Sequence, residues 1–404
     1  MGQIDKKRPV APGQPDPSYG NAGVVIPDPS TSGFVRALVV DSQERQVFVL
    51  WVLDQFWLYR NRKDGTPDLG FGEGGVVKGS FVEGVPSRPC DVLVKSNGDI
   101  LLIGEVMNDP QKGEIAVISF KSDGKLDSEF GTRIIQAIPA QATHSQQPFG
   151  CLQPNGNILI SAGYSISDGV NPAREFGLLI NLLATGELNL QFGGGTGIVP
   201  VHFEGKDTTL SRVVALNDGG CVVGGTQSVS HGHQVESHAA LARYSASGSL
   251  VTAFGHKGYA VVEVLNSGLY DLAVYDEIIY LVGRGNSSQA MVAVYDSAGQ
   301  PLQSFNDGRP YVDETPFTSW FAIKVQQDGS VVVAGSVLSP RGEQIYARLL
   351  QDGQFDKKFA HEGRGHLGRG SFFHLALQPQ LKRIVLAGNQ VDPVNTPALY
   401  GIKM

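Results

Sequence analysis

The sequence predicts an all-β protein built from short strands, and three observations lead to this fold class. Glycine accounts for 51 of the 404 residues, and a glycine content this high indicates many tight turns because glycine tolerates a positive φ. The apolar segments are short and are divided by Asn-Gly and Asp-Gly pairs, which favour β-hairpins. The third observation is a repeat that extends along the whole chain.

The repeat is marked by a short motif, an aromatic residue followed by a small or polar one. Its seven copies, whose first members we call the anchor aromatics, are Tyr19-Gly20, Phe71-Gly72, Phe130-Gly131, Phe192-Gly193, Phe254-Gly255, Phe305-Asn306 and Phe359-Ala360. Successive anchors are 52, 59, 62, 62, 51 and 54 residues apart. A regular period is typical of repeat architectures, so we expect the anchor aromatics to pack in the core between repeats.

Each repeat contains four short apolar runs, and a tight turn divides the middle pair. Examples are VLVKSNGDILLIG at 92–104 and CLQPNGNILISAG at 151–163. Four strands per repeat is the composition of one blade of a β-propeller. The sequence therefore predicts a single domain over residues 1–404, a seven-bladed β-propeller of four-stranded blades.

The two ends of the chain are expected to share the last blade. The final repeat ends at PALYGIKM and lacks the aromatic motif with its following apolar run. That motif and run occur near the N-terminus, in QPDPSYGNAGVV from Gln14. Joining the two ends would remove the exposed sheet edges of an open array. We therefore predict that the N-terminal segment completes the seventh blade.

The segments that lead to each anchor resemble the delta-60 repeat. The copies nearest to that pattern are KSDGKLDSEFG at 121–131, QPNGNILISAG at 153–163 and ARYSASGSLVTAFG at 242–255. The resemblance covers nearly the whole chain, and the sixth repeat departs from it at Phe305-Asn306 and at Tyr275-Asp276-Glu277. It implies a β-propeller of a bacterial, often surface or secreted, protein in a family whose function is largely undefined.

Charge and hydropathy exclude two classes of partner. The formal net charge is −7 and basic residues form no stripe, which disfavours nucleic acid. No apolar run approaches the ~20 residues that span a bilayer, so no membrane insertion is expected.

The N-terminus lacks a hydrophobic signal-peptide core, which favours a cytoplasmic location or export by a non-classical route. We expect a monomer.

Two groups of side chains are candidate metal ligands. The first is a histidine-rich hairpin loop with His231, His233, Glu236 and His238, residue types that suit Zn²⁺. The second consists of aspartate pairs before three anchors, which could supply oxygen ligands for Ca²⁺: Asp64 and Asp68, Asp123 and Asp127, Asp352 and Asp356. A solvated loop and turn-stabilising aspartates explain the same residues. No cofactor is therefore expected, with calcium or zinc as the alternatives.

A central channel is the expected ligand site. We place the innermost strand of each blade directly after its anchor, where one polar residue interrupts each apolar run and could line the channel. These candidate binding residues are Asp28, Lys78, Gln136, His202, Glu263, Asp313 and Arg369. Converging polar groups at the mouth of a concave site could orient a small polar ligand.

The sequence favours a binding protein over an enzyme. It contains neither G-x-S-x-G nor H-E-x-x-H. We therefore predict a non-catalytic module or scaffold that recognises a glycan or a protein partner. Trp51, Trp57 and Trp320 are candidates for glycan contact, with strand packing as the other interpretation of Trp51 and Trp57. The alternative function is a metal-dependent hydrolase or lyase with its site at the central channel.

Overall fold

The computed structural model describes residues 10–28, 32–231, 234–286, 288–338, 342–391 and 395–404. Within these ranges the regular structure consists of β-strands and four short 3-10 helices, η1 (Gly193–Gly195), η2 (Phe203–Gly205), η3 (Asn306–Gly308) and η4 (Pro379–Leu381). No helix among these residues has the length and hydropathy that a membrane crossing needs. The prediction of an all-β protein is confirmed.

Five antiparallel sheets have four strands each, in chain order. The first sheet contains β2 (Phe34–Val40), β3 (Gln46–Val52), β4 (Gln55–Asn61) and β5 (Val76–Gly79). The second contains β6 (Ser87–Val94), β7 (Ile100–Val106), β8 (Glu114–Phe120) and β9 (Thr132–Ile135). The third contains β10 (His144–Leu152), β11 (Ile158–Ile166), β12 (Arg174–Leu182) and β13 (Ile198–Val201). The fourth contains β14 (Asp207–Ala215), β15 (Cys221–His231), β16 (Gln234–Tyr244) and β17 (Tyr259–Val261). The fifth contains β18 (Gly268–Tyr275), β19 (Ile278–Gly285), β20 (Gln289–Tyr295) and β21 (Tyr311–Val312).

The sixth sheet has seven strands in the order β1-β27-β26-β25-β24-β23-β22. Its members are β22 (Thr318–Val325), β23 (Val331–Val337), β24 (Glu343–Leu349), β25 (Arg364–Gln378), β26 (Arg383–Gln390), β27 (Thr396–Lys403) and β1 (Val24–Val25). The long strand β25 joins two halves of this sheet. Its residues up to Arg369 pair with β24, and its residues from Gly370 onward pair with β26.

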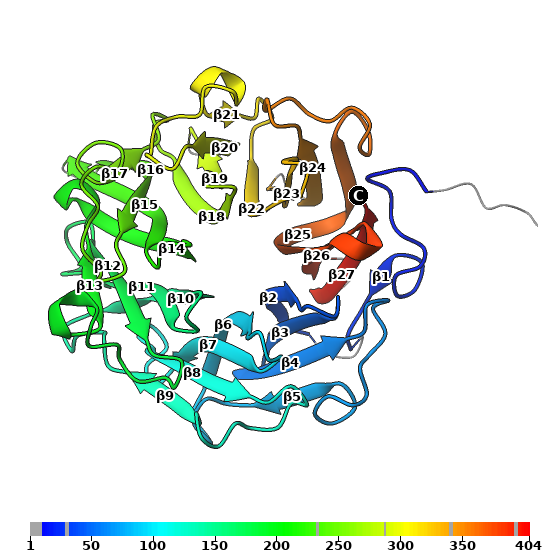
Figure 1. Ribbon diagram of the computed structural model, residues 1–404, viewed down its shortest axis with the longest axis horizontal. Helices are drawn as coiled ribbons and strands as arrows, with labels where there is room; N and C mark the ends of the chain where they lie inside the picture. The colour runs from blue at the N-terminus through cyan, green and yellow to red at the C-terminus, as the bar shows by residue number, and fades with distance from the viewer. Residues whose placement is uncertain (1–9, 29–31, 232–233, 287, 339–341, 392–394) are drawn as a thin grey trace, which may run out of the picture.

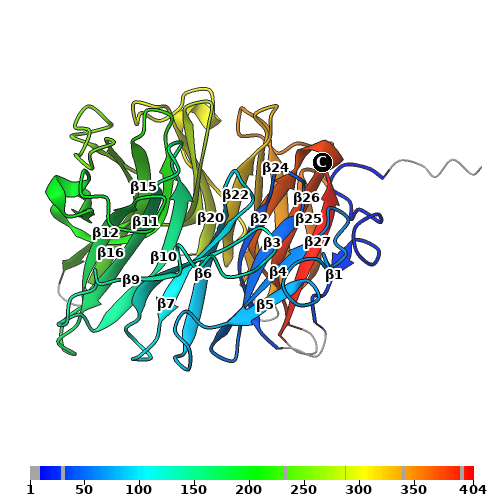
Figure 2. The ribbon, with the colours of Figure 1, turned by 60° about the horizontal axis from the view of Figure 1, so that its bottom comes forward.

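The sheets stand in a ring around a central axis (Figure 1). Strand β2 contacts β6, and the contacts continue through β10, β14, β18, β22 and β25 back to β2. The strands that line the axis are therefore β2, β6, β10, β14, β18, β22 and the second half of β25. Figure 2 shows the strands running through the thickness of the ring. The arrangement is that of a β-propeller-like fold with a central channel.

The anchor aromatics fill the spaces between sheets, which confirms their predicted role. All seven are at most 4% exposed. Phe254, for example, packs with Leu272 and Ile279 of the following sheet. The residue after the anchor extends the contact in six of the seven repeats, as where the N–H of Gly255 donates to the carbonyl of Ala298 at 2.7 Å; Gly131 donates locally to Asp127. Tight turns are part of this packing: Gly248 has φ +81°, and a Cβ added there would lie 3.0 Å from the ring of Phe192.

The N-terminal segment is part of the sixth sheet. Val24 and Val25 of β1 pair with Tyr400 and Leu399 of β27. Upstream, the N–H of Gly13 donates to the Lys403 carbonyl at 2.7 Å. Residues close to the two ends of the chain therefore lie side by side, as Figure 2 also shows.

The order of strands corrects one prediction. Six of the seven strands that follow the anchors are edge strands of their sheets, such as β5 after Phe71 and β9 after Phe130, while β25 after Phe359 lies in the middle of the seven-stranded sheet. The innermost strands come after the next connecting segment. The prediction was wrong because a period fixes the length of a repeat but not where the repeat begins, and the anchor closes a sheet rather than opening one.

Candidate binding site at the mouth of the central channel

A β-bulge interrupts each strand that faces the axis. The pairing register shifts between Val35 and Ala37, Pro89 and Asp91, Gln146 and Phe149, Leu210 and Arg212, Leu269 and Asp271, Trp320 and Ala322, and Phe372 and His374. A bulge leaves a residue outside the ladder and redirects side chains nearby. The same irregularity at the same place in every inner strand therefore creates a ring of residues that can point toward the channel.

These bulges line a pocket of about 370 Å³, which we call the mouth pocket. Its walls come from five of the inner strands and the second half of β25, and its residues are Phe34, Val35, Arg36, Gln147, Phe149, Leu210, Ser211, Arg212, Tyr270, Phe321, Phe373 and His374. One part of this wall is aromatic and another part is polar.

The aromatic part is formed by Tyr270, Phe321 and Phe373, which we call the aromatic arc. They are the bulge residues of three neighbouring inner strands, β18, β22 and β25. The ring centroids of Tyr270 and Phe321 are 5.2 Å apart, and those of Phe321 and Phe373 are 5.5 Å apart. All three side chains are partly accessible, so they present aromatic surface to anything in the pocket.

The polar part is built around Arg36. From β2 its Nε donates to the Pro89 carbonyl of β6 at 3.3 Å, and its Nη2 donates to Oε1 of Gln147 in β10 at 2.5 Å. The guanidinium therefore reaches across one strand to the next, along the side of the mouth that has no arc residue. These two bonds use only part of its five N–H donors.

Arg212 forms the floor of the mouth pocket. Its Nε lies 2.9 Å from Oδ1 of Asp271, and its guanidinium carbon lies 3.8 Å above the Phe149 ring. The second oxygen of Asp271 accepts the N–H of Ile323 at 2.9 Å. Asp271 therefore holds Arg212 and joins the fifth sheet to the sixth.

Asp91 occupies the same position after its bulge as Asp271. Its Oδ2 accepts the N–H of Gly150 from the next sheet at 3.0 Å. Burial raises the pKa of Asp91, while Arg212 and the hydrogen bonds from Gly150 and Val92 oppose the rise. Both aspartates thus join neighbouring sheets, and Asp271 also forms the ion pair with Arg212.

His374 stands where the mouth pocket continues into the channel. Together with Arg212 it lines both the mouth pocket and a second pocket of about 420 Å³ further along the axis. Burial, and then the positive charges of Arg212, Arg36 and Lys324, hold the pKa of His374 well below its usual value. Its imidazole is therefore neutral near pH 7.

The structure does not bring the predicted channel residues together, and that prediction is wrong. Six of them lie at or just after edge strands, around the rim of the ring: Asp28, Lys78, Gln136, His202, Glu263 and Asp313. The seventh, Arg369, lies in β25, at the end of the half that pairs with β24. Several have local partners there. Lys78 lies over the Trp57 ring at 3.6 Å, and Asp313 pairs with Arg364 at 2.9 Å. The cause is the inverted strand order described above.

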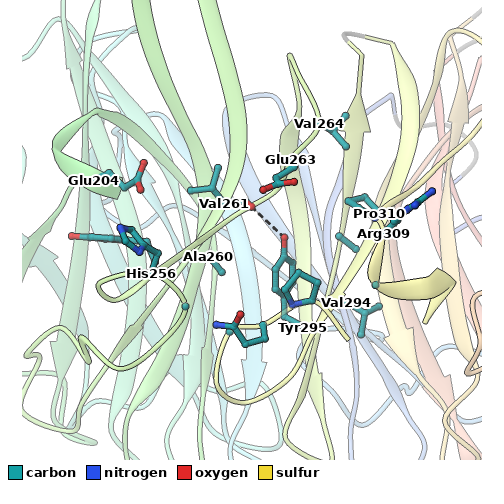
Figure 3. Close-up of a pocket in the computed structure, with 17 residues that line it drawn as sticks. Glu204, His256, Ala260, Val261, Glu263, Val264, Val294, Tyr295, Arg309 and Pro310 are labelled. Carbon is teal, nitrogen blue, oxygen red and sulfur yellow. Dashed lines mark hydrogen bonds between the residues drawn. The ribbon is translucent and has the colours of Figure 1, made fainter. Parts of the chain in front are cut away.

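Glu263 lines a large cleft between the outer strands of the fourth and fifth sheets (Figure 3). This outer cleft measures about 740 Å³. Glu204 and His256 lie at one end and Arg309 at the other, with Glu263 and Tyr295 between them. The Tyr295 hydroxyl donates to the Val261 carbonyl at 3.5 Å. The cleft draws on two sheets only, whereas the mouth pocket draws on five.

The candidate zinc ligands lie in the long β15–β16 hairpin. His231 ends β15 and pairs with Gln234 through the backbone, while His233 falls outside the described residues. Nε2 of His238 is 3.2 Å from Oε1 of Glu236. Within the described ranges, no three His, Cys, Asp or Glu side chains are grouped so that they could hold a metal ion.

The aspartate pairs that could supply calcium ligands make hydrogen bonds and ion pairs within the protein. The first member stabilises a turn, as Asp64 does by accepting the N–H of Thr66 at 3.0 Å. The second member forms an ion pair, as Asp68 does with Arg60 at 2.8 Å. The repeats at Asp123/Asp127 and Asp352/Asp356 behave in the same way.

Sequence reasoning missed the aromatic arc and looked to tryptophan instead. Trp320 is only 1% exposed and Trp57 is covered by Lys78. A signal for the arc was present, because LYDLA at 269–273, WFAIK at 320–324 and FFHLA at 372–376 place an aromatic residue at the same point of three repeats.

Comparisons with known proteins support the fold. No family model and no curated protein matches the chain. Among solved structures, a catalytically inactive variant of virginiamycin B lyase from Staphylococcus aureus, solved with quinupristin, superposes with a TM-score of 0.55 at 10% identity over 94% of this chain and 98% of that one. A protein of unknown function from Dyadobacter fermentans gives 0.49 at 10% identity, covering 96% of this chain and 100% of that one. The PQQ-bound aldose sugar dehydrogenase from Streptomyces coelicolor gives 0.42 at 10% identity, covering 97% and 99%. At this identity the likeness to the lyase shows a β-propeller-like all-β fold and nothing about activity.

Proposed function

We propose that the protein is a single seven-bladed propeller of the delta-60 repeat type. On this interpretation the seven-stranded sheet is two blades that share β25, since the two halves of that strand pair with different neighbours. The N-terminal strand β1 then supplies the outermost strand of the last blade. Seven inner strands, one per blade, enclose the channel.

We propose further that the protein is a non-catalytic binding module whose mouth pocket holds a carbohydrate that carries a carboxylate. The observation that supports this most directly is the composition of the pocket, where the aromatic arc and the Arg36 guanidinium line different parts of one wall. Concave sites with apolar walls and a few convergent polar groups are the usual form of small-ligand sites.

Each part of this pocket matches one part of such a ligand. The C–H face of a pyranose ring is apolar and can stack on the faces of Phe321 and Phe373, as amphipathic ligands do on aromatic side chains. A carboxylate is matched by the planar donor fork of a guanidinium, which binds it through charge-assisted hydrogen bonds. Gln147 beside Arg36 adds an amide able to meet sugar hydroxyls.

The test is a calorimetric titration with galacturonate, glucuronate and mannuronate, each compared with its neutral parent sugar. At least one uronate is expected to bind, and its parent sugar to bind at least about tenfold more weakly, because the charge-assisted bond is lost. Phe321→Ala and Arg36→Gln should each weaken the uronate by about tenfold or more. Arg309→Gln, which removes an exposed charge in the outer cleft, serves as the matched control. Failure of all three uronates to bind, or equal loss in the control, would overturn the proposal.

A lyase reaction in the same pocket is the second candidate, and His374 favours it. Its neutral imidazole lies beside Arg212, which could neutralise a uronate carboxylate and so acidify the adjacent C–H. His374 would take that proton, and the C–H electron pair would form a C=C bond. The bond to the glycosidic oxygen would break, and the departing oxygen would take a proton from water.

This second candidate predicts an unsaturated uronate product, which is followed by its ultraviolet absorbance with oligouronates as substrate. His374→Gln should abolish product while uronate binding stays within about twofold of wild type, a small change in free energy. Absence of product from the wild-type protein at saturating oligouronate would leave the binding module as the function.

A further inference from the structure

A second depression opens from the mouth pocket and runs outward between the fourth and fifth sheets. It measures about 570 Å³ and shares Ser211 and Tyr270 with the mouth pocket, so the two pockets adjoin at these residues. We call it the hydroxyl groove, because four of its lining residues are Thr209, Thr226, Ser228 and Ser237.

These four hydroxyl residues form a row across the fourth sheet. Thr209 of β14 is paired with Thr226 of β15, and Ser228 of β15 is paired with Ser237 of β16. Thr226 and Ser228 are two residues apart on one strand and so share a face. The row therefore leads from the inner strand toward the outside, and all four hydroxyls lie on the groove side of the sheet.

Most of these hydroxyls are not used by the protein. Thr226 Oγ1 accepts the N–H of Leu269 at 3.3 Å. The described part of the chain offers no hydrogen-bond partner to the side chains of Thr209, Ser228 and Ser237. A row of available hydroxyl groups in a concave surface is suited to a ligand that is itself rich in hydroxyls.

The wall of the hydroxyl groove opposite the hydroxyl row leaves space for a ligand at Gly268 and contributes one cationic side chain, Arg284. It begins at Gly268, whose lack of a side chain keeps the groove open, and Gly268 is paired with Arg284 of the neighbouring strand β19. Arg284 is exposed, and its guanidinium makes no ion pair within the described ranges. The long strands β15 and β16, of 11 residues each against 8 in β18 and β19, carry the hydroxyl row beyond the core.

We propose that the ligand is a linear acidic oligosaccharide, with one uronate in the mouth pocket and the following sugar in the hydroxyl groove, where Arg284 meets its anionic group. This inference rests on the proposed function, since it extends the chain from the sugar in the mouth pocket. The groove contributes affinity that a single sugar cannot gain.

The test measures affinity against chain length for the uronate that binds in the mouth pocket, using its monomer, dimer, trimer and tetramer. For the wild-type protein the affinity is expected to rise by about tenfold from monomer to trimer. Arg284→Gln and Ser228→Leu should each lose most of that gain while they bind the monomer as wild type does. Arg309→Gln, the control outside the groove, should keep both the monomer affinity and the gain.

The possible failures separate the two proposals. If no monomer binds to the wild-type protein, the proposed function itself fails. If the monomer binds but longer chains bind no more tightly, the groove is not a subsite and this inference is overturned. If both groove variants keep the full rise in affinity from monomer to trimer, the inference is overturned as well, because the oligosaccharide would then leave the mouth pocket in another direction.

Discussion

Deletion of residues 1–26 is expected to lower the melting temperature sharply or to leave the protein insoluble. The deletion removes β1 and exposes β27 as an unpaired edge, which favours aggregation. It also removes Tyr19, an anchor aromatic that is fully buried. A thermal melt of the truncated chain beside the full chain checks the prediction, and equal melting temperatures would contradict closure by the N-terminal segment.

A single substitution isolates the electrostatic part of this closure. Asp16 is buried, with Nε of Arg383 at 2.7 Å and Nζ of Lys403 at 2.8 Å from its Oδ2. Burial opposes its ionisation, but hydrogen bonds from Lys403, Ser18 and Arg383 hold the pKa of Asp16 well below its usual value. Asp16→Asn leaves Arg383 buried without its counter-charge, which costs about 3–5 kcal/mol.

The control for Asp16→Asn is Asp123→Asn. Asp123 also pairs with a lysine, Lys125, at 2.9 Å, but both side chains are exposed. Its loss should change the free energy of unfolding by no more than about 0.5 kcal/mol. Denaturant unfolding of both variants gives the comparison, and similar losses in the two would show that the buried ion pair does not fasten the ends together.

Asp271→Ala is expected to destabilise the protein by about 3–5 kcal/mol and to abolish uronate binding. The aspartate is buried and serves two partners from different sheets, the guanidinium of Arg212 and the N–H of Ile323. Its removal leaves a partly buried cation and a buried donor without acceptors. Arg212 is then free to leave the floor of the mouth pocket, so the site loses its shape as well as its charge.

A pair of the same two residue types with an exposed aspartate provides the comparison for Asp271. Asp218 and Arg243 are 2.8 Å apart, and the Asp218 side chain is 54% exposed against 10% for Asp271. Asp218→Ala should therefore cost no more than about 1 kcal/mol and leave uronate binding unchanged. Denaturant unfolding measures the stability of both variants, and titration measures their affinity for uronate. A loss of stability and affinity in Asp271→Ala no larger than that in Asp218→Ala would contradict the role assigned to Asp271.

The features that were predictable from the sequence are those set by local chemistry. Asn-Gly and Asp-Gly turns predicted hairpins such as β6–β7 and β10–β11, and the pairing registers confirm them. The anchor aromatics were predicted to pack in the core between repeats, and the burial of Phe254 and its equivalents confirms this prediction. Each of these signals acts over a few residues and repeats along the chain.

The candidate site depends on contacts that no local pattern contains. Arg36 meets Gln147 more than a hundred residues away, and both are placed by bulges that turn and strand signals do not reveal. Because most anchors are followed by an edge strand, polar residues counted from the anchors lie on the rim, where Lys78 and Asp313 already have partners. Tyr270, Phe321 and Phe373 occupy one equivalent position when each repeat is taken to begin at its inner strand.

A crystal structure of the protein soaked with its tightest-binding uronate would locate the bound sugar and so decide whether the mouth pocket is the binding site. We expect the sugar ring to lie against Phe321 and Phe373, with its carboxylate on the guanidinium of Arg36. A uronate bound instead in the outer cleft beside Glu263 and Tyr295, with the mouth pocket empty at saturating ligand, would contradict it.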